Sequence, residues 1–206
     1  MDPRLFTLSV ILIQLLLAPA LVVTIYGFTK AMVSAALGDP LPKRDRRVTL
    51  NPLRHIEIIG FVFFVVSGIF GWSKPVETTN LYYKNRRRDT LLVHAMPIVV
   101  IILVGLLARV LLMTTQIHVL LNVFFLHVSM LAVTLGVLNL IPVAPFDGGR
   151  ILGLYLSPNQ TVSLASREKV ILLLLTFLML IWSNNPVAMI IRMLVDSILS
   201  LVGFVI

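Results

Sequence analysis

Six apolar runs separated by polar segments constrain this chain more than any other feature of its sequence. About 20 apolar residues, at 1.5 Å each, cross a hydrocarbon core of about 30 Å. The pattern predicts an all-α polytopic membrane protein: a single domain with about five transmembrane helices plus a re-entrant segment. Short extended pieces, including a possible strand at 47–50, are expected in its cytoplasmic loops. The predicted segments are transmembrane 5–37, loop 38–57, re-entrant or short helix 58–72, transmembrane 89–113, transmembrane 118–141, loop 142–168, transmembrane 169–183 and transmembrane 186–206.

The composition excludes a water-soluble globule. Hydrophobic residues make up 58% of the 206 residues and charged residues 13%, against about 45–50% and about 25% in soluble domains. The chain has no cysteine, which rules out disulfides, zinc–thiolate sites and iron–sulfur clusters. Its net charge of +8 comes from basic clusters between apolar runs, as in membrane proteins, so we expect no nucleic-acid partner.

Two basic clusters determine the predicted topology. They lie within residues 43–54 and 74–88, on either side of the short run 58–72. If that run crossed the membrane, the clusters would face opposite sides, against the positive-inside rule. We therefore predict a re-entrant run, two cytoplasmic clusters, and an N-terminus outside a bacterial-type inner membrane. We expect the second cluster to anchor the topology. The alternative is that it forms a site for anionic lipid headgroups at Lys84, Arg86, Arg87 and Arg88.

Residues 139–150 combine a charged side chain with irregular backbone at the end of an apolar run. The prolines interrupt helical hydrogen bonds, and the glycines permit close backbone approach or positive φ. An ionisable group at membrane depth is a functional candidate, and irregular backbone there requires surrounding protein or a wet cavity. The alternative is a helix-capping aspartate in an interfacial turn. The motif residues are Asn139, Pro142, Pro145, Asp147, Gly148 and Gly149.

The segment resembles the second motif of the site-2 protease family of intramembrane zinc metalloproteases, in its short bacterial group. Three earlier blocks, at 37–40 (LGDP), 47–56 (RVTLNPLRHI) and 71–76 (GWSKPV), resemble that group's blocks in order and spacing. The resemblance covers roughly residues 20–155. In the family, the aspartate of the Asp-Gly motif is the third zinc ligand, so the resemblance implies that role for Asp147.

The sequence departs from the family at the metal-binding helix. That helix carries H-E-x-x-H in the family, with two zinc ligands and a glutamate that activates the zinc-bound water. By the family spacing, Tyr26, Gly27 and Lys30 replace the first histidine, the glutamate and the second histidine. An ammonium repels zinc, so we expect no metal, no catalytic residue and only a vestigial ligand at Asp147. By their predicted positions, none of the chain's histidines rebuilds the site; they are His55, His94, His118 and His127.

Two ion pairs are predicted instead. The resemblance brings Lys30 and Asp147 to one point, where a lysine ammonium can neutralise the carboxylate that a metal once balanced. The alternative is that Lys30 snorkels to the cytoplasmic interface. Arg192 and Asp196 are four residues apart on the last run, which predicts an intrahelical pair inside the bilayer.

Three functions stay open at this point. The first is a catalytically inactive member of this fold that acts as a scaffold or accessory subunit for other integral membrane proteins. The second is an active intramembrane metalloprotease that cleaves transmembrane substrates with an unorthodox zinc site. The third is a small-solute or proton pathway through Lys30, Asp147, Arg192 and Asp196, although the chain offers few other polar residues to line one.

Overall fold

A computed structural model describes the chain at residues 2–67, 71–114, 118–143, 145–168, 170, 171, 173, 174, 177 and 186–203. These residues are mostly helical, and four helices are long and apolar enough to cross a membrane. The first, Pro3–Ala36, is continuous through α1 (Pro3–Leu12), the π-helical turn η1 (Ile13–Leu17) and α2 (Ala18–Ala36). The others are α5 (Arg86–Thr114), α6 (Val119–Leu140) and α10 (Pro186–Gly203). The predicted span 169–183 lies largely outside the described residues.

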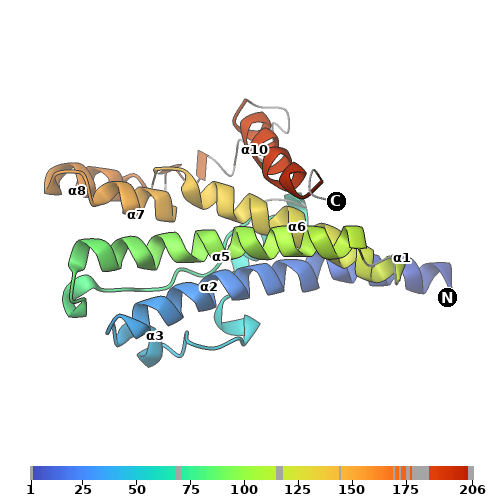
Figure 1. Ribbon diagram of the computed structural model, residues 1–206, viewed down its shortest axis with the longest axis horizontal. Coiled ribbons are helices and arrows are strands. Elements are labelled where there is room, and N and C mark those ends of the chain that lie inside the picture. The colour runs from blue at the N-terminus through green and yellow to red at the C-terminus, as the bar shows by residue number, and fades with distance from the viewer. Residues whose placement is uncertain are drawn as a thin grey trace.

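The helices α2, α5 and α6 pack side by side and enclose the main core (Figure 1). Buried apolar side chains from all three helices form this core, among them Val22, Val23, Ile98, Ile101 and Leu135. The helix α10 lies at an angle to this bundle (Figure 1) and packs chiefly against α6 through a second apolar cluster. The bundle therefore provides a dry interior in which a polar side chain needs partners.

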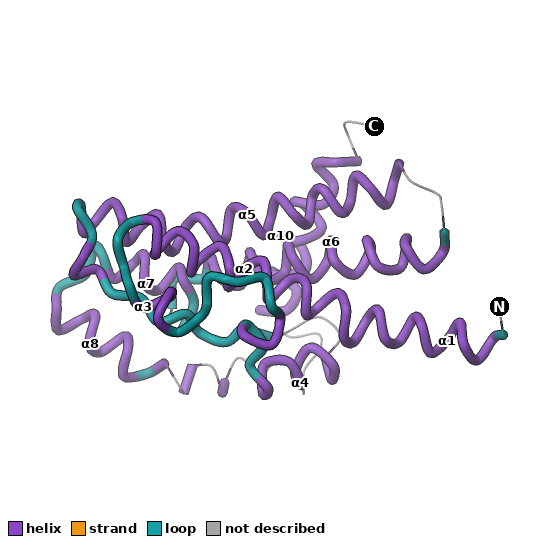
Figure 2. Tube along the Cα trace, turned by 90° about the horizontal axis from the view of Figure 1, so that it is seen from below, coloured by secondary structure: helices purple, strands orange, loops and turns teal. Residues whose placement is uncertain are grey.

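The segment between α2 and α5 contains short elements only. They are α3 (Leu41–Arg44), the 3₁₀ turns η2 (Pro52–Arg54) and η3 (Asn80–Tyr82), and α4 (Ile58–Ser67). At 1.5 Å per residue, α4 is about 15 Å long, half of a hydrocarbon core. It lies to one side of the long helices (Figure 2). Its length agrees with the short or re-entrant helix predicted within 58–72.

The strand considered at 47–50 does not form. The segment instead bends, and pairing with the later block is limited to an isolated antiparallel bridge between Ile56 and Ser73. The Arg47 guanidinium holds the two blocks together by donating to the carbonyl oxygens of Lys74 at 2.7 Å and Pro75 at 3.1 Å. A buried side chain thus takes the place of a regular ladder.

The predicted loop 142–168 contains two short helices, which corrects the sequence-based expectation. They are α7 (Asp147–Gly153) and α8 (Pro158–Ser166). The start of α8 is stabilised by a capping box, in which Ser157 and Gln160 satisfy each other's backbone N–H groups. Asp147 is the first residue of α7, so this helix begins at the motif aspartate.

Candidate functional site

The Asp147 carboxylate accepts hydrogen bonds from three side chains on two helices. Lys30 on α2 donates to Oδ1 at 2.5 Å, and His94 on α5 donates to the same oxygen through Nδ1 at 2.8 Å. Tyr26 on α2 donates its hydroxyl to Oδ2. An ionised carboxylate only accepts, so the His94 proton in this contact is on Nδ1. We call these four residues the Asp147 cluster.

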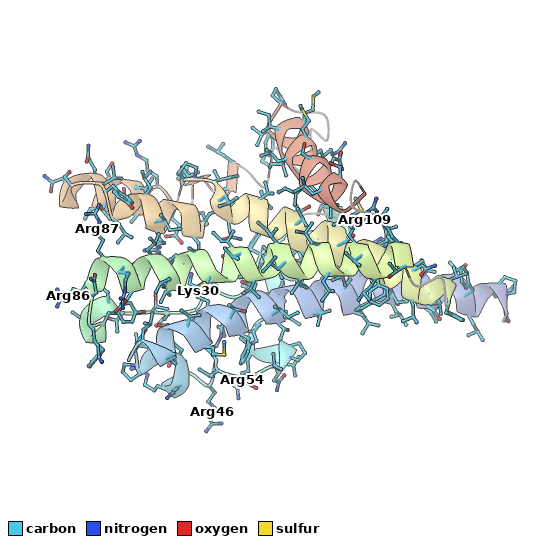
Figure 3. All side chains as sticks on the ribbon, in the orientation of Figure 1. Lys30, Arg46, Arg54, Arg86, Arg87 and Arg109 are labelled. Atoms are coloured by element: carbon cyan, nitrogen blue, oxygen red, sulfur yellow. The ribbon has the colours of Figure 1, made fainter. Side chains whose placement is uncertain are left out.

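The Asp147 cluster lies inside the helical bundle. The side chain of Asp147 is 2% exposed, that of His94 8% and that of Lys30 13%. Tyr26 and Lys30 are one helical turn apart, so they project from the same face of α2. Figure 3 shows Lys30 between the ribbons of α2 and α5. One buried carboxylate thereby connects α2, α5 and α7, and the contact to the Lys30 ammonium is charge-assisted.

The backbone before and after Asp147 fixes the position of the carboxylate. The preceding helix α6 ends at Leu140, two residues before Pro142. After the turn, a Cβ on Gly148 would lie 2.5 Å from the carbonyl oxygen of Leu140, so no side chain fits there. The Asn139 side chain accepts from the Asp147 backbone N–H at 3.5 Å. The motif residues therefore serve to place Asp147 against α2 and α5.

Gly27 faces His55, which is fully buried. A Cβ on Gly27 would clash with Nδ1 of this ring. The other ring nitrogen, Nε2, donates to the Thr49 carbonyl at 2.7 Å, and Nδ1 has no hydrogen-bond partner among the described residues. The pKa of His55 is lowered from its ordinary value, chiefly because the ring is buried. The hydrogen bond to Thr49 opposes this shift, and the Arg47 guanidinium adds to it. The imidazole thus fills the space beside Gly27.

A cavity of about 710 Å³ lies beside the cluster. Lys30 and His94 contribute to its wall, together with the extended segment 75–79 and residues of α7 and α8. Its lining also includes Arg150 and Glu168, whose side chains approach within 3.5 Å of each other. Two members of the cluster therefore border this cavity, although the Asp147 oxygens themselves are engaged by the chain's own donors.

The residues around Asp147 do not fit a zinc ion. Zinc needs deprotonated donors at about 2.0–2.2 Å. Asp147 is instead paired with the Lys30 ammonium, and His94 and Tyr26 also direct protons at the carboxylate. No group of three His, Asp or Glu side chains that could hold a metal occurs among the residues described. The chemistry that this donor set supports is neutralisation of a buried carboxylate.

The predictions for individual site residues have different outcomes. Spacing and resemblance place Tyr26, Lys30 and Asp147 together, and the structure brings them into contact. They do not reveal that His94 joins them. The available signal was depth. His94 lies toward the N-terminal end of α5 and Lys30 toward the C-terminal end of α2, which the predicted topology puts on the same side of the membrane.

Arg192 and Asp196 do not form the predicted intrahelical pair. Both are exposed on α10, and across the described residues neither has an ion-pair partner within 4.0 Å. Four-residue spacing permits such a contact but stabilises it by only about 0.2–0.5 kcal/mol, so the side chains are not forced together. No polar partner of Asp147 comes from α10 either.

The basic group 84–88 lies at the same end of the molecule as α8, where Figure 3 shows Arg86 and Arg87. The Arg87 guanidinium stacks over the Tyr155 ring, 4.6 Å from its centroid, and Arg88 pairs with Asp89 at 3.0 Å. Lys84 and Arg86 are exposed.

Comparison with known proteins agrees with this architecture. Residues 20–182 match the sequence model described as Peptidase family M50. Over 167 residues the chain is 32% identical to "Putative zinc metalloprotease YwhC" of Bacillus subtilis (strain 168). The aligned region covers 74% of this chain and 76% of that protein. No solved structure matches the chain. With its long apolar helices, the chain is a multi-pass membrane protein, and it belongs to peptidase family M50, the site-2 protease family.

Proposed function

We propose that this chain is a catalytically inactive member of the site-2 protease family that acts as a scaffold or accessory subunit for other integral membrane proteins. The observation that carries the proposal is the occupation of both Asp147 oxygens by donors of the chain itself. Each carboxylate oxygen already accepts from a donor of the chain, and a metal cation bound there would lie against the Lys30 ammonium. The proposal therefore includes no zinc cofactor.

The same contacts give the cluster a structural role. Asp147 links α7 to α2 through Lys30 and to α5 through His94. Buried polar groups of this kind are costly unless every member is satisfied, and each of these contacts supplies a partner. A fold fixed in this way presents a stable surface on which other transmembrane helices can pack in lipid.

The competing function is intramembrane proteolysis. It is suggested by the name of the Bacillus subtilis relative, "Putative zinc metalloprotease YwhC". In this chain, zinc would have to displace the Lys30 ammonium, and Gly27 offers no side chain to act as the general base. We therefore rank proteolysis second.

Metal content and proteolysis of the purified full chain decide between these functions. We expect substoichiometric zinc by elemental analysis, the same zinc content in Asp147→Ala, and no cleavage of a transmembrane reporter in proteoliposomes. An outcome of one zinc per chain, with zinc and reporter cleavage both lost in Asp147→Ala, would overturn the proposal. Isolation from native membranes, with identification of the associated chains, then tests the scaffold role directly.

The proposal extends to the surroundings of the chain. We propose a bacterial-type inner membrane with the N-terminus outside, which puts the basic group 84–88 at the cytoplasmic face. Lys84 and Arg86 are exposed there without an ion-pair partner among the described residues. They are the members of the group best placed to contact anionic headgroups.

A further inference from the structure

The helix α10 buries one face and exposes the rest. Ala188, Ile191, Val195, Leu199 and Val202 are buried, and their spacing of three and four residues is that of one helix face. This face packs on α6 and α5. Of the four candidate spans, α10 has the smallest share of buried residues, 22% of its most apolar 18-residue stretch. Most of its surface therefore faces lipid or another protein.

The exposed surface of α10 has two unlike flanks. One carries Ile190, Leu194 and Leu201, which suit acyl chains. The other carries Arg192, Asp196 and Ser200, which follow one another at intervals of four residues and so form a single stripe. Both charged residues of α10 lie on this second flank, so it is the flank that requires a partner.

The position of Asp196 makes a polar partner for this flank necessary. This residue lies ten residues after Pro186, about 15 Å along a helix of about 27 Å, and hence near the middle of the span. A short aspartate side chain cannot reach the interface from there, whereas arginine can snorkel. A lipid-facing carboxylate at this depth is costly. Within the part of the chain that the structure describes, Asp196 has no cation within 4.0 Å.

We propose that the stripe of Arg192, Asp196 and Ser200 is the interface with a second copy of this chain. The stripe carries both signs of charge, so it complements itself. Copies in one membrane share an orientation, and a two-fold axis along the membrane normal sets their α10 helices side by side in the same direction. Arg192 of each copy then meets Asp196 of the other, the reciprocal pairing that a two-fold interface requires.

The dimensions suit this arrangement. Arg192 and Asp196 differ in height by about 6 Å, one helical turn, which the long arginine side chain bridges when two helices are in contact. Ser200 and Gly203, further along the same flank, are small enough to let the backbones approach. A Cβ on Gly203 would meet no atom within 4 Å, so this position is open in the single chain. The pairing concerns α10 alone and does not depend on whether the Asp147 cluster is catalytic.

Charge reversal tests the pairing in the full-length protein. Two differently tagged copies are co-expressed, and co-isolation from detergent-solubilised membranes reports pairing. We expect wild-type copies to pair, and Arg192→Asp or Asp196→Arg copies to lose at least tenfold of the self-pairing. An Arg192→Asp copy mixed with an Asp196→Arg copy has complementary stripes, so pairing between them should return to the wild-type level.

A variant with the two charges exchanged keeps the test valid if a single variant fails to insert into the membrane. This swapped chain, the double variant Arg192→Asp with Asp196→Arg, should pair with itself. It should not pair with wild type, because mixed pairs oppose like charges. Ile190→Ala with Leu194→Ala, on the apolar flank, is the matched control and should pair as wild type does. Wild-type copies that fail to pair, single variants that still self-pair, or a swapped chain that pairs equally with wild type would each overturn the proposal. Loss of a different, co-isolating protein in the swapped chain would overturn it in favour of an unlike partner.

Discussion

At Asp147, a single buried carboxylate accepts hydrogen bonds from three side chains. Only the lysine contributes a permanent positive charge, so the electrostatic balance of the site depends chiefly on Lys30. The Lys30 side chain is 13% exposed, and that of Asp147 is 2% exposed. In a pair this buried, the desolvation of the two ions offsets much of their attraction, whereas removing one partner strands the other.

Replacement of Lys30 by methionine should therefore destabilise the protein by about 3–5 kcal/mol. The variant keeps the length of the side chain but leaves the Asp147 carboxylate without its counter-ion. The free energy of unfolding can be measured by denaturant titration in mixed micelles.

The double variant is the control for this prediction. Lys30→Met with Asp147→Leu removes both charges and should recover much of the loss. If the losses of the two single variants add in the double variant, the side chains do not interact energetically and the ion pair contributes nothing specific.

Gly27 provides a second test at the residue scale. Its replacement by alanine inserts a methyl group against the buried His55 ring, so the loop must shift away from α2. Overpacking of this kind costs about 1–3 kcal/mol. Gly27→Ala should be destabilising in the wild-type chain and nearly neutral in a His55→Ala background, as measured by the same titration. An equal cost in both backgrounds would show that His55 does not occupy this space.

The sequence predicted part of this site. Tyr26, Lys30 and Asp147 follow from the spacing of motifs along the chain, because the resemblance assigns each of them to the position of a zinc ligand in the family. His94 and His55 do not follow from it, because α5 and the 47–56 segment reach the site only through tertiary packing. A single sequence does not show which distant residues meet through tertiary packing.

At the scale of the element, two glycines bring α5 and α6 together. A Cβ on Gly105 would lie 2.6 Å from a methyl carbon of Val133 and 3.1 Å from the Ser129 carbonyl oxygen. A Cβ on Gly136 would lie 2.5 Å from Ile102. Helices in lipid gain stability from close packing, and small residues permit it. These glycines therefore set the separation of the two helices, and with it the position of His94.

Gly105→Ala should push α5 away from α6 and destabilise the protein by about 1–3 kcal/mol. The backbone oxygen of Ser129 cannot rotate away, so the helices themselves must separate. Gly153→Ala on α7 is the matched control, because the nearest atom to a Cβ there is a Thr161 methyl carbon at 3.5 Å, an ordinary contact distance. The comparison uses thermal denaturation in one detergent, and equal melting temperatures for the two variants would contradict the predicted close packing.

The helices were predictable to different degrees. The long runs become helices because a spanning backbone must satisfy its own hydrogen bonds. The helices α7 and α8 lie in a segment read as a loop, although Ser157 and Gln160 have the spacing of a capping box. The strand considered at 47–50 was wrong, because the buried Arg47 side chain, not a backbone ladder, binds this segment to residues 74 and 75.

For the molecule as a whole, the arrangement of charge along the bundle bears on orientation. Figure 3 shows Arg46, Arg54, Arg86 and Arg87 in the half of the molecule away from the N-terminus. These residues come from both basic clusters, on either side of α4. A helix of ten residues does not separate two compartments by itself, so the distribution favours one side of the membrane for both clusters.

We therefore expect residues 43–54 and 74–88 to be accessible from the cytoplasmic side and the N-terminus from the outside. The chain contains no cysteine, so single cysteines at exposed positions report accessibility without background. Arg46→Cys and Arg86→Cys should react with a membrane-impermeant maleimide only in inside-out vesicles, and Asp2→Cys only in right-side-out vesicles. Permeabilised vesicles supply the control for total reactivity. Labelling of Arg46→Cys and Arg86→Cys from opposite faces would mean that the segment between them crosses the membrane completely, and the re-entrant topology would then be wrong.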